Sequence, residues 1–114
     1  MAFVRVARTD EILPGHTAFF YVGSTPVLLA NVDNRIFAVH GLCPHRDNPL
    51  EGACLYGSLV DCPWHHFEYD VRTGENFYPR NVYPADMPHL EAQLRPLQTY
   101  PVEVRDSEVW VNIT

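Results

Sequence analysis

Short runs of apolar or alternating residues, separated by polar turns, dominate the first third of the chain. Residues 3–7 alternate between apolar and polar side chains, which is typical of a half-buried strand. Runs rich in branched and aromatic residues predict further strands over residues 17–22, 26–32 and 35–40. The turns between these runs are short, so the pattern predicts an antiparallel meander. A meander of this kind indicates an all-β sandwich or small barrel.

The same strand pattern returns near the end of the chain. Residues 100–105 and 108–113 predict a final hairpin, and residues 67–70 predict a short strand before it. Between residues 41 and 70, glycine turns and short apolar runs indicate a small subdomain inserted into the meander. No composition shift marks a linker, so we expect one domain over residues 1–114.

The segment from residue 75 to residue 99 departs from the strand pattern. It contains four prolines, at positions 79, 84, 88 and 96. Met87, Leu90, Leu94 and Leu97 recur at a spacing of three or four. We therefore expect one short helix near residues 87–95, which either covers one side of the core or widens a docking surface.

Composition and charge narrow the class of protein. The formal net charge is −6, so we expect no nucleic-acid partner, because phosphate binding requires a basic surface. An acidic carrier would instead suit a partner with a basic docking patch. No apolar run approaches the roughly 18 residues that a membrane helix needs. The first residues are typical of a strand rather than of a signal peptide, so we expect a cytoplasmic protein without a membrane partner.

Two short motifs carry the chemistry of the chain. Cys43-Pro44-His45 forms the first and Cys62-Pro63-Trp64-His65 the second, with sixteen residues between them. Two cysteines and two histidines can hold a tetrahedral zinc ion, or an iron pair in which each iron takes two protein ligands. The C-x-H turn is tighter than the usual C-x-x-C zinc knuckle, and it suits a loop that directs both side chains toward one point.

At these residues the chain resembles the Rieske family, whose pattern is C-x-H followed by C-x-x-H. The similarity is greatest to the small soluble Rieske ferredoxins that supply electrons to bacterial ring-hydroxylating oxygenases. It implies a Rieske fold, with the cluster-binding subdomain at about residues 41–70, and one [2Fe–2S] cluster. Cys43 and Cys62 would then bind one iron, and His45 and His65 the other. Neutral imidazoles donate less charge than thiolates, so the electron should reside on the histidine side.

Two neighbouring residues are not expected to be ligands. The chain has three cysteines, an odd number that argues against a disulfide framework. Cys54 would then be left over as a small buried or half-buried thiol. His66 is adjacent to a motif histidine but off the motif spacing, so we expect it to shape the loop surface only.

The residues around the motifs differ from those of respiratory Rieske subunits. Each loop of those subunits carries an extra cysteine, and the two extra cysteines form a disulfide. Asn48 and Trp64 occupy the corresponding positions here. A serine near the cluster is replaced by Phe67, whereas a tyrosine is matched by Tyr69. Hydrogen bonds to cluster sulfurs raise the reduction potential. The resemblance therefore implies a potential well below that of respiratory Rieske proteins.

The resemblance implies a monomeric one-electron carrier rather than an enzyme. It would take electrons from a flavin-dependent NAD(P)H reductase and deliver them to a terminal oxygenase. The sequence shows no catalytic triad, phosphate loop or nucleotide fingerprint. One alternative is the small Rieske-like subunit of an NAD(P)H nitrite reductase, which would stay in one complex. A structural zinc module is a third hypothesis, which the colour of the protein would exclude.

Overall fold

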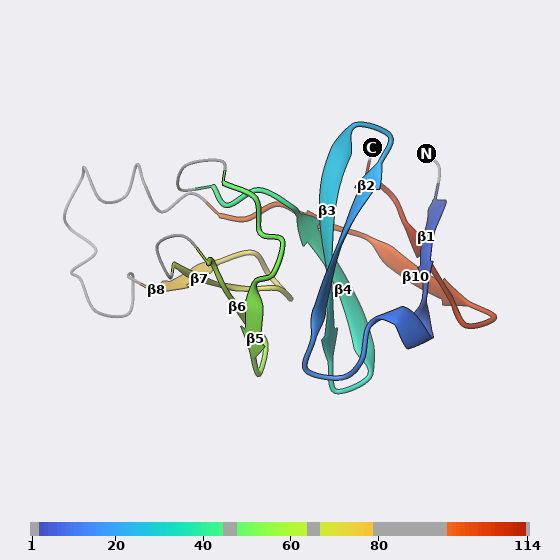
Figure 1. Cartoon of the computed structure of the whole chain (residues 1–114), viewed down its shortest axis with the longest axis horizontal. Helices are drawn as coiled ribbons and strands as arrows, with labels where there is room; N and C mark the ends of the chain where they lie inside the picture. Colours follow the sequence, from blue (N-terminus) through green and yellow to red (C-terminus); the bar gives the residue numbers. More distant parts are fainter. Residues whose placement is uncertain (1–2, 45–47, 64–66, 79–95, 114) are drawn as a thin grey trace.

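The computed structural model describes residues 3–44, 48–63, 67–78 and 96–113. In these residues the chain forms three antiparallel sheets, and one short 3-10 helix spans Thr9–Glu11. Figure 1 shows two of the sheets at one end of the molecule and the third beside them. In the part of the chain described, no helix is long and apolar enough to cross a membrane.

The first two sheets form a base. One has the order β1-β11-β10 and the other the order β2-β3-β4-β9. The strands of the first are β1 (Val4–Arg8), β10 (Val102–Arg105) and β11 (Glu108–Val111). Those of the second are β2 (Thr17–Val22), β3 (Thr25–Val32), β4 (Arg35–His40) and β9 (Thr99–Tyr100). The base therefore joins the N-terminal meander to the C-terminal hairpin.

The third sheet has the order β5-β6-β7-β8. Its strands are β5 (Cys54–Tyr56), β6 (Leu59–Asp61), β7 (Glu68–Asp70) and β8 (Asn76–Tyr78). All four are short, and the predicted insertion of short strands is confirmed. The sheet extends beyond residue 70, however, because β8 pairs with β7.

Strand β3 is buried on both faces, which explains its continuous apolar run. Val27 and Leu29 point into the core between the two base sheets. Leu28 and Ala30 point the other way, into a second core shared with the third sheet. Fully burying a leucine side chain contributes about 1.5–3 kcal/mol, so both cores depend strongly on this strand. Successive residues of one strand thereby hold the base and the third sheet together.

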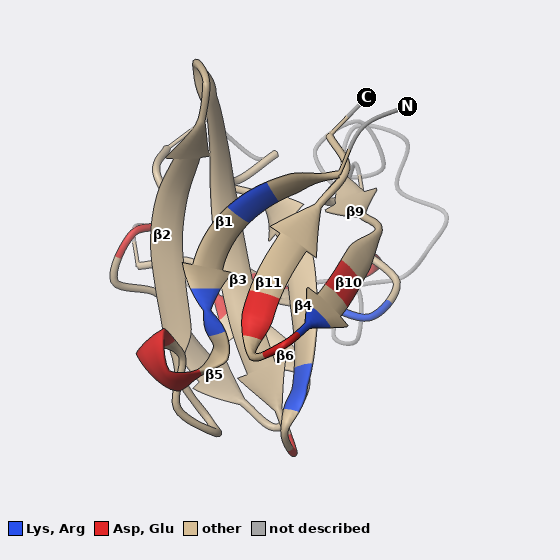
Figure 2. Ribbon diagram, turned by 90° about the vertical axis from the view of Figure 1, so that its right-hand side faces the viewer, with Lys and Arg blue, Asp and Glu red and all other residues tan. Residues whose placement is uncertain are grey.

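Charged residues of both signs alternate over the outer face of the sheet β1-β11-β10 (Figure 2). Arg5 pairs with Glu108 at 2.6 Å, and Arg105 pairs with Glu103 at 2.7 Å. Exposed pairs of this kind contribute at most about 1 kcal/mol each to stability. Because each pair joins opposite charges, the paired residues form neither a basic nor an acidic patch on this face.

The strands predicted from the sequence are confirmed with small shifts at their ends. The predicted strand over residues 100–105 is wrong in one respect, because it is divided at Pro101. Tyr100 pairs with β4 in one base sheet, whereas Val102 begins the pairing with β11 in the other. Proline has no N–H to donate to a ladder, so it fits the point where the chain changes sheets. Strand β8 was not predicted, and the helix expected near residues 87–95 lies outside the described residues.

A close backbone contact at Gly74 ties the end of the chain to the third sheet. The Leu97 N–H donates to the Gly74 carbonyl oxygen at 2.7 Å. Gly74 has a φ of +84°, and a Cβ atom there would overlap the Leu97 carbonyl oxygen. Only glycine therefore suits this position, both for its backbone conformation and for the space available.

We predict that Gly74→Ala destabilises the protein far more than Gly57→Ala. Gly57 also has a positive φ, +62°, but a Cβ atom there would meet nothing within 4 Å. The Gly57 variant should lose roughly 1–2 kcal/mol, the cost of the left-handed conformation alone. The Gly74 variant should lose about 3 kcal/mol or more, because backbone overlap adds to that cost. Denaturant unfolding of the two variants measures the difference, and equal losses would contradict the described contact.

Candidate metal centre

The two cysteines of the motifs stand at the base of two loops that close in the same way. The Cys43 N–H donates to the Asn48 carbonyl oxygen at 2.8 Å, and the Cys62 N–H donates to the Phe67 carbonyl oxygen at 2.8 Å. In each loop the cysteine is thus bonded to the residue five positions later. The equivalence is in the backbone, since Asn48 and Phe67 have unrelated side chains.

Each loop has an antiparallel stem below its closing bond. In the first, Leu42 forms a bridge with Pro49, and the Leu50 N–H donates to the Gly41 carbonyl oxygen at 2.7 Å. The stem of the second is the pairing of β6 with β7, which ends at Asp61 and Glu68. A hairpin stem fixes the direction in which the residue at its end presents its side chain.

Both cysteines are buried in the core beneath the loops. Cys43 and Cys62 are each 1% exposed, and they belong to the same cluster of buried side chains. That cluster also contains Leu50, Val60 and Tyr69. The cysteines form no disulfide. The two thiols thus lie in one apolar core, below two loops that are closed by equivalent backbone hydrogen bonds.

The hydroxyl group of Tyr69 lies beside these thiols. Tyr69 is fully buried, and its Oη atom is 4.0 Å from the Cys43 Sγ atom. Burial raises the pKa of Tyr69, and Cys43 raises it further through charge and a hydrogen bond. Cys62 adds a smaller effect of the same sign, whereas the Asn76 side chain lowers this pKa. Tyr69 therefore keeps its proton. In this structure the Cys43 thiol donates to Tyr69 Oη, and a thiolate at Cys43 would instead accept a hydrogen bond from the Tyr69 O–H.

The structure describes only some of the predicted site residues. Cys43 and Cys62 belong to one core. His45, His65, Trp64 and His66 lie outside the described residues. Among the residues that the structure does describe, no three His, Cys, Asp or Glu side chains are grouped to hold a metal ion. The buried Asn76 was missed, because a lone asparagine in a proline-rich segment gives no local signal.

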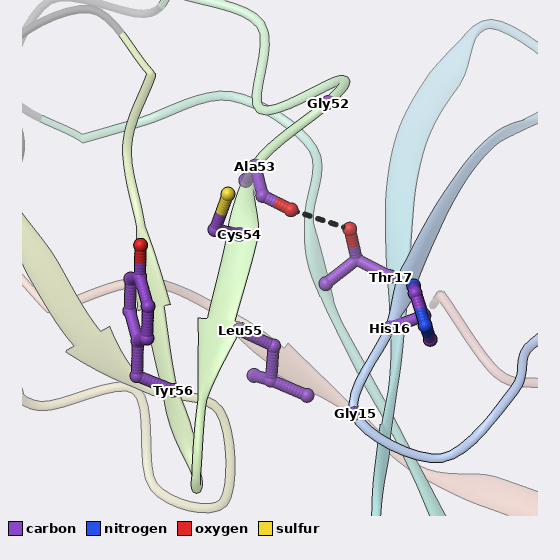
Figure 3. A pocket seen from close by; sticks show the side chains of 8 residues that line it. All are labelled: Gly15, His16, Thr17, Gly52, Ala53, Cys54, Leu55 and Tyr56. Atoms are coloured by element: carbon purple, nitrogen blue, oxygen red, sulfur yellow. Dashed lines mark hydrogen bonds between the residues drawn. The ribbon is translucent and has the colours of Figure 1, made fainter.

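The prediction that Cys54 is buried or half-buried is wrong. Cys54 is exposed at the start of the edge strand β5, and it lines a pocket of about 440 Å³ (Figure 3). Across the pocket, the Thr17 hydroxyl donates to the Ala53 carbonyl oxygen at 2.8 Å and joins the base to the third sheet. Strand alternation explains the exposure, because Leu55 packs against the core and its neighbours in β5 point outward.

Comparison with known proteins decides the family. The model of the Rieske [2Fe–2S] domain family matches residues 2–101. The chain belongs to this family. It is 30% identical to the biphenyl dioxygenase ferredoxin subunit of Pseudomonas sp. strain KKS102, over 100% of this chain and 94% of that one. It is 28% identical to the ferredoxin component of biphenyl 2,3-dioxygenase from Rhodococcus jostii strain RHA1, over 99% of this chain and 94% of that one.

A solved structure agrees with the sequence relatives. The ferredoxin of carbazole 1,9a-dioxygenase from Nocardioides aromaticivorans IC177 matches with a TM-score of 0.81 and 26% identity, over 100% of both chains. The all-β Rieske fold predicted from the sequence is thus confirmed. The chain is a Rieske ferredoxin, an electron-transfer component of the kind found in bacterial ring-hydroxylating dioxygenase systems. Its cofactor is one [2Fe–2S] cluster.

We predict that one of the three cysteines reacts with a thiol reagent in the native protein. Cys54 is exposed, whereas Cys43 and Cys62 are buried. The native protein should therefore react with about one equivalent, and the Cys54→Ser variant with almost none. Mass spectrometry of the labelled, digested protein identifies the site. Labelling of Cys43 or Cys62 before unfolding would contradict the described burial.

Proposed function

We propose that Cys43 and Cys62 bind one iron of the cluster, and that His45 and His65 bind the other. The observation that carries this proposal is the shared closure of the two loops above one buried core. The donor set fits the group, because two protected thiols and two imidazoles match the mixed ligation of a Rieske centre. A bound cluster supplies a one-electron centre whose histidine-bound iron is reduced more readily than an iron held by cysteines alone.

The residues below the loops exclude water and adjust the potential. Leu50, Val60 and Val71 are buried around the two cysteines and keep that side dry. Phe67 is half-buried against the same core and offers no hydroxyl to a sulfur atom. Tyr69 is the hydroxyl in this core that approaches a cysteine sulfur. Its hydrogen bond would favour the more negative reduced state and raise the potential moderately.

The carrier would exchange one electron at a time between two larger partners. A flavin-dependent NAD(P)H reductase would supply the electron, and a terminal oxygenase would receive it. Both partners would dock weakly at the loop tips, beside His45 and His65, because a carrier must release each partner quickly. The net charge of −6 would steer basic docking patches toward the protein.

The remaining expectations fit this role. The protein would act as a monomer in the cytoplasm, with neither nucleic acid nor membrane as a partner. Residues 1–114 would form one Rieske domain, with the cluster-binding subdomain at about residues 41–70 and β8 added to its sheet. Paired charges on the outer face of β1-β11-β10 agree with the absence of a basic patch there.

Ligand replacement tests the proposed ligand set. Changing Cys43, His45, Cys62 or His65 to alanine should abolish the red-brown colour, because an open iron site admits water and oxidant. Cys54→Ala and His66→Ala are matched controls that should keep the cluster. Iron and sulfide analysis, with electron paramagnetic resonance of the reduced protein, measures the outcome. A colourless, zinc-replete protein from iron-sufficient cells would refute the proposal.

Tyr69→Phe should keep the cluster and lower its potential. The substitution removes the hydroxyl beside Cys43 and leaves the ring to fill the core. We expect a fall of a few tens of millivolts, since 1 kcal/mol corresponds to roughly 40 mV for a one-electron couple. Tyr100→Phe is the control, because its hydroxyl lies 3.0 Å from His40 Nδ1 in the base. Equal potentials in Tyr69→Phe and the unchanged protein would contradict the role of Tyr69.

Electron delivery can be followed directly. The reduced protein, mixed rapidly with an oxidised Rieske oxygenase of the ring-hydroxylating class, should lose one electron per cluster at a rate that falls with salt. The His66→Ala variant with an intact cluster shows whether the loop surface contributes. Stable co-purification with a large sirohaem subunit, and no transfer to any oxygenase, would instead indicate a fixed subunit.

A further inference from the structure

The two cysteine loops are attached to different parts of the molecule. The first begins directly after β4 of the base, where the Gly41 N–H donates to the Pro26 carbonyl oxygen at 2.9 Å. The second is the end of the β6–β7 hairpin in the third sheet. The place of Cys43 relative to Cys62 therefore depends on how closely the stem of the first loop approaches the base.

Gly41 lies so close to the base that a side chain would not fit. A Cβ atom there would be 2.9 Å from two carbon atoms of Pro26, one of them in the backbone, and 2.9 Å from Cε2 of Phe19. Carbon atoms in contact are normally about 3.5–4.0 Å apart. Gly41 has no positive φ, in contrast to Gly74, so space rather than backbone conformation explains the glycine.

The base is the less yielding side of this contact. Pro26 belongs to β3, which pairs with a strand on each side and is buried on both faces over most of its length. The Phe19 ring packs against the core below the loops and lies edge-on to Tyr21, with ring centroids 5.4 Å apart. An added methyl group at Gly41 would therefore displace the stem of the loop more than it would displace the base.

A displacement of Gly41 would reach Cys43 through the stem. The Gly41 carbonyl oxygen accepts from the Leu50 N–H at 2.7 Å, and the bridge between Leu42 and Pro49 comes next. The closing bond at Cys43 follows that bridge directly. Relief of the overlap requires a shift of roughly 0.5 Å, the difference between 2.9 Å and a normal contact. Metal–ligand distances tolerate only about 0.2 Å, so such a shift would alter a bound metal centre.

We infer that Gly41 is a positioning residue: because it has no side chain, the first loop lies against the base at the place that lets Cys43 and Cys62 bind the same cluster. The inference rests on the proposed ligand set. The effect of Gly41 is carried by the backbone of the stem, two residues before Cys43.

Gly41→Ala tests the inference in the cluster-loaded protein. Electron paramagnetic resonance of the reduced cluster should show shifted principal g values, because the first loop moves relative to the second. In protein labelled with ¹⁵N in histidine, the coupling that His45→Cys removes should change more than the coupling that His65→Cys removes, since His45 follows Gly41 in the displaced loop. Unchanged g values, or an equal or larger change in the His65 coupling, would overturn the inference.

Phe19→Leu separates the contact from a general loss of stability. Leucine lacks the Cε2 atom that the added methyl group would meet. In the Phe19→Leu background, Gly41→Ala should therefore shift the g values less than in the unchanged protein, and equal shifts in both backgrounds would contradict the contact. Gly57→Ala is the matched control, because a Cβ atom there meets nothing within 4 Å. It should lose stability through its left-handed backbone conformation and leave the g values unchanged.

The test remains decisive if Gly41→Ala does not retain the cluster. Recovery of the cluster in the doubly substituted protein, Phe19→Leu with Gly41→Ala, would then support the inference. No recovery, with intact clusters in Phe19→Leu and Gly57→Ala, would overturn it.

The outcome is separate from that of the proposed ligand set. A Cys43→Ala variant that keeps its cluster would refute the ligand role of Cys43, whatever Gly41 does. If Cys43→Ala loses the cluster, and Gly41→Ala keeps both the cluster and its g values, the ligand set stands and the positioning role alone fails.

Discussion

The molecule depends on two backbone hydrogen bonds that close two loops in the same manner, one at Cys43 and one at Cys62. A mixed-ligand iron centre needs thiolates held at a fixed place before the metal arrives, since a preformed site costs less to fill. The two closures provide this, because each fixes the backbone of a cysteine above a core that is already packed. The rest of the fold can be understood as the support for this pair of loops.

That support comes from the base sheet β2-β3-β4-β9. Strand β3 is buried on both faces, so it packs against the sheet β1-β11-β10 on one side and the cluster-binding sheet on the other. The two cysteines belong to the core on the side of the cluster-binding sheet, together with Leu28 of β3 and Val39 of β4. A change in the packing of β3 would therefore alter the surroundings of the two cysteines. The bond from Thr17 to Ala53 and the contact of Gly74 with Leu97 add two further connections between base and insertion.

Most of the base could be predicted from the sequence, because period-two alternation and short turns are local signals. The exposure of Cys54 could also be predicted, since Cys54 and Leu55 face opposite sides of a strand and Leu55 is the apolar one. Strand β8 was not readable in this way. Its three residues gain their register from a bulge against β7, and a run of three residues is too short for its alternation to indicate a strand or a bulge. The same holds for Asn76, whose burial follows from the bulge. Within the metal centre, the motif alone indicated the ligands, whereas the hydroxyl of Tyr69 acquired its place beside Cys43 through the fold.

In the proposed centre, two histidine nitrogens and two cysteine sulfurs share one cluster. Electron–nuclear double resonance of the reduced protein, labelled with ¹⁵N in histidine only, tests it most directly. We expect two strongly coupled ¹⁵N nuclei, one of which disappears in each of the variants His45→Cys and His65→Cys that retain iron. A reduced cluster without strongly coupled histidine nitrogen would contradict it.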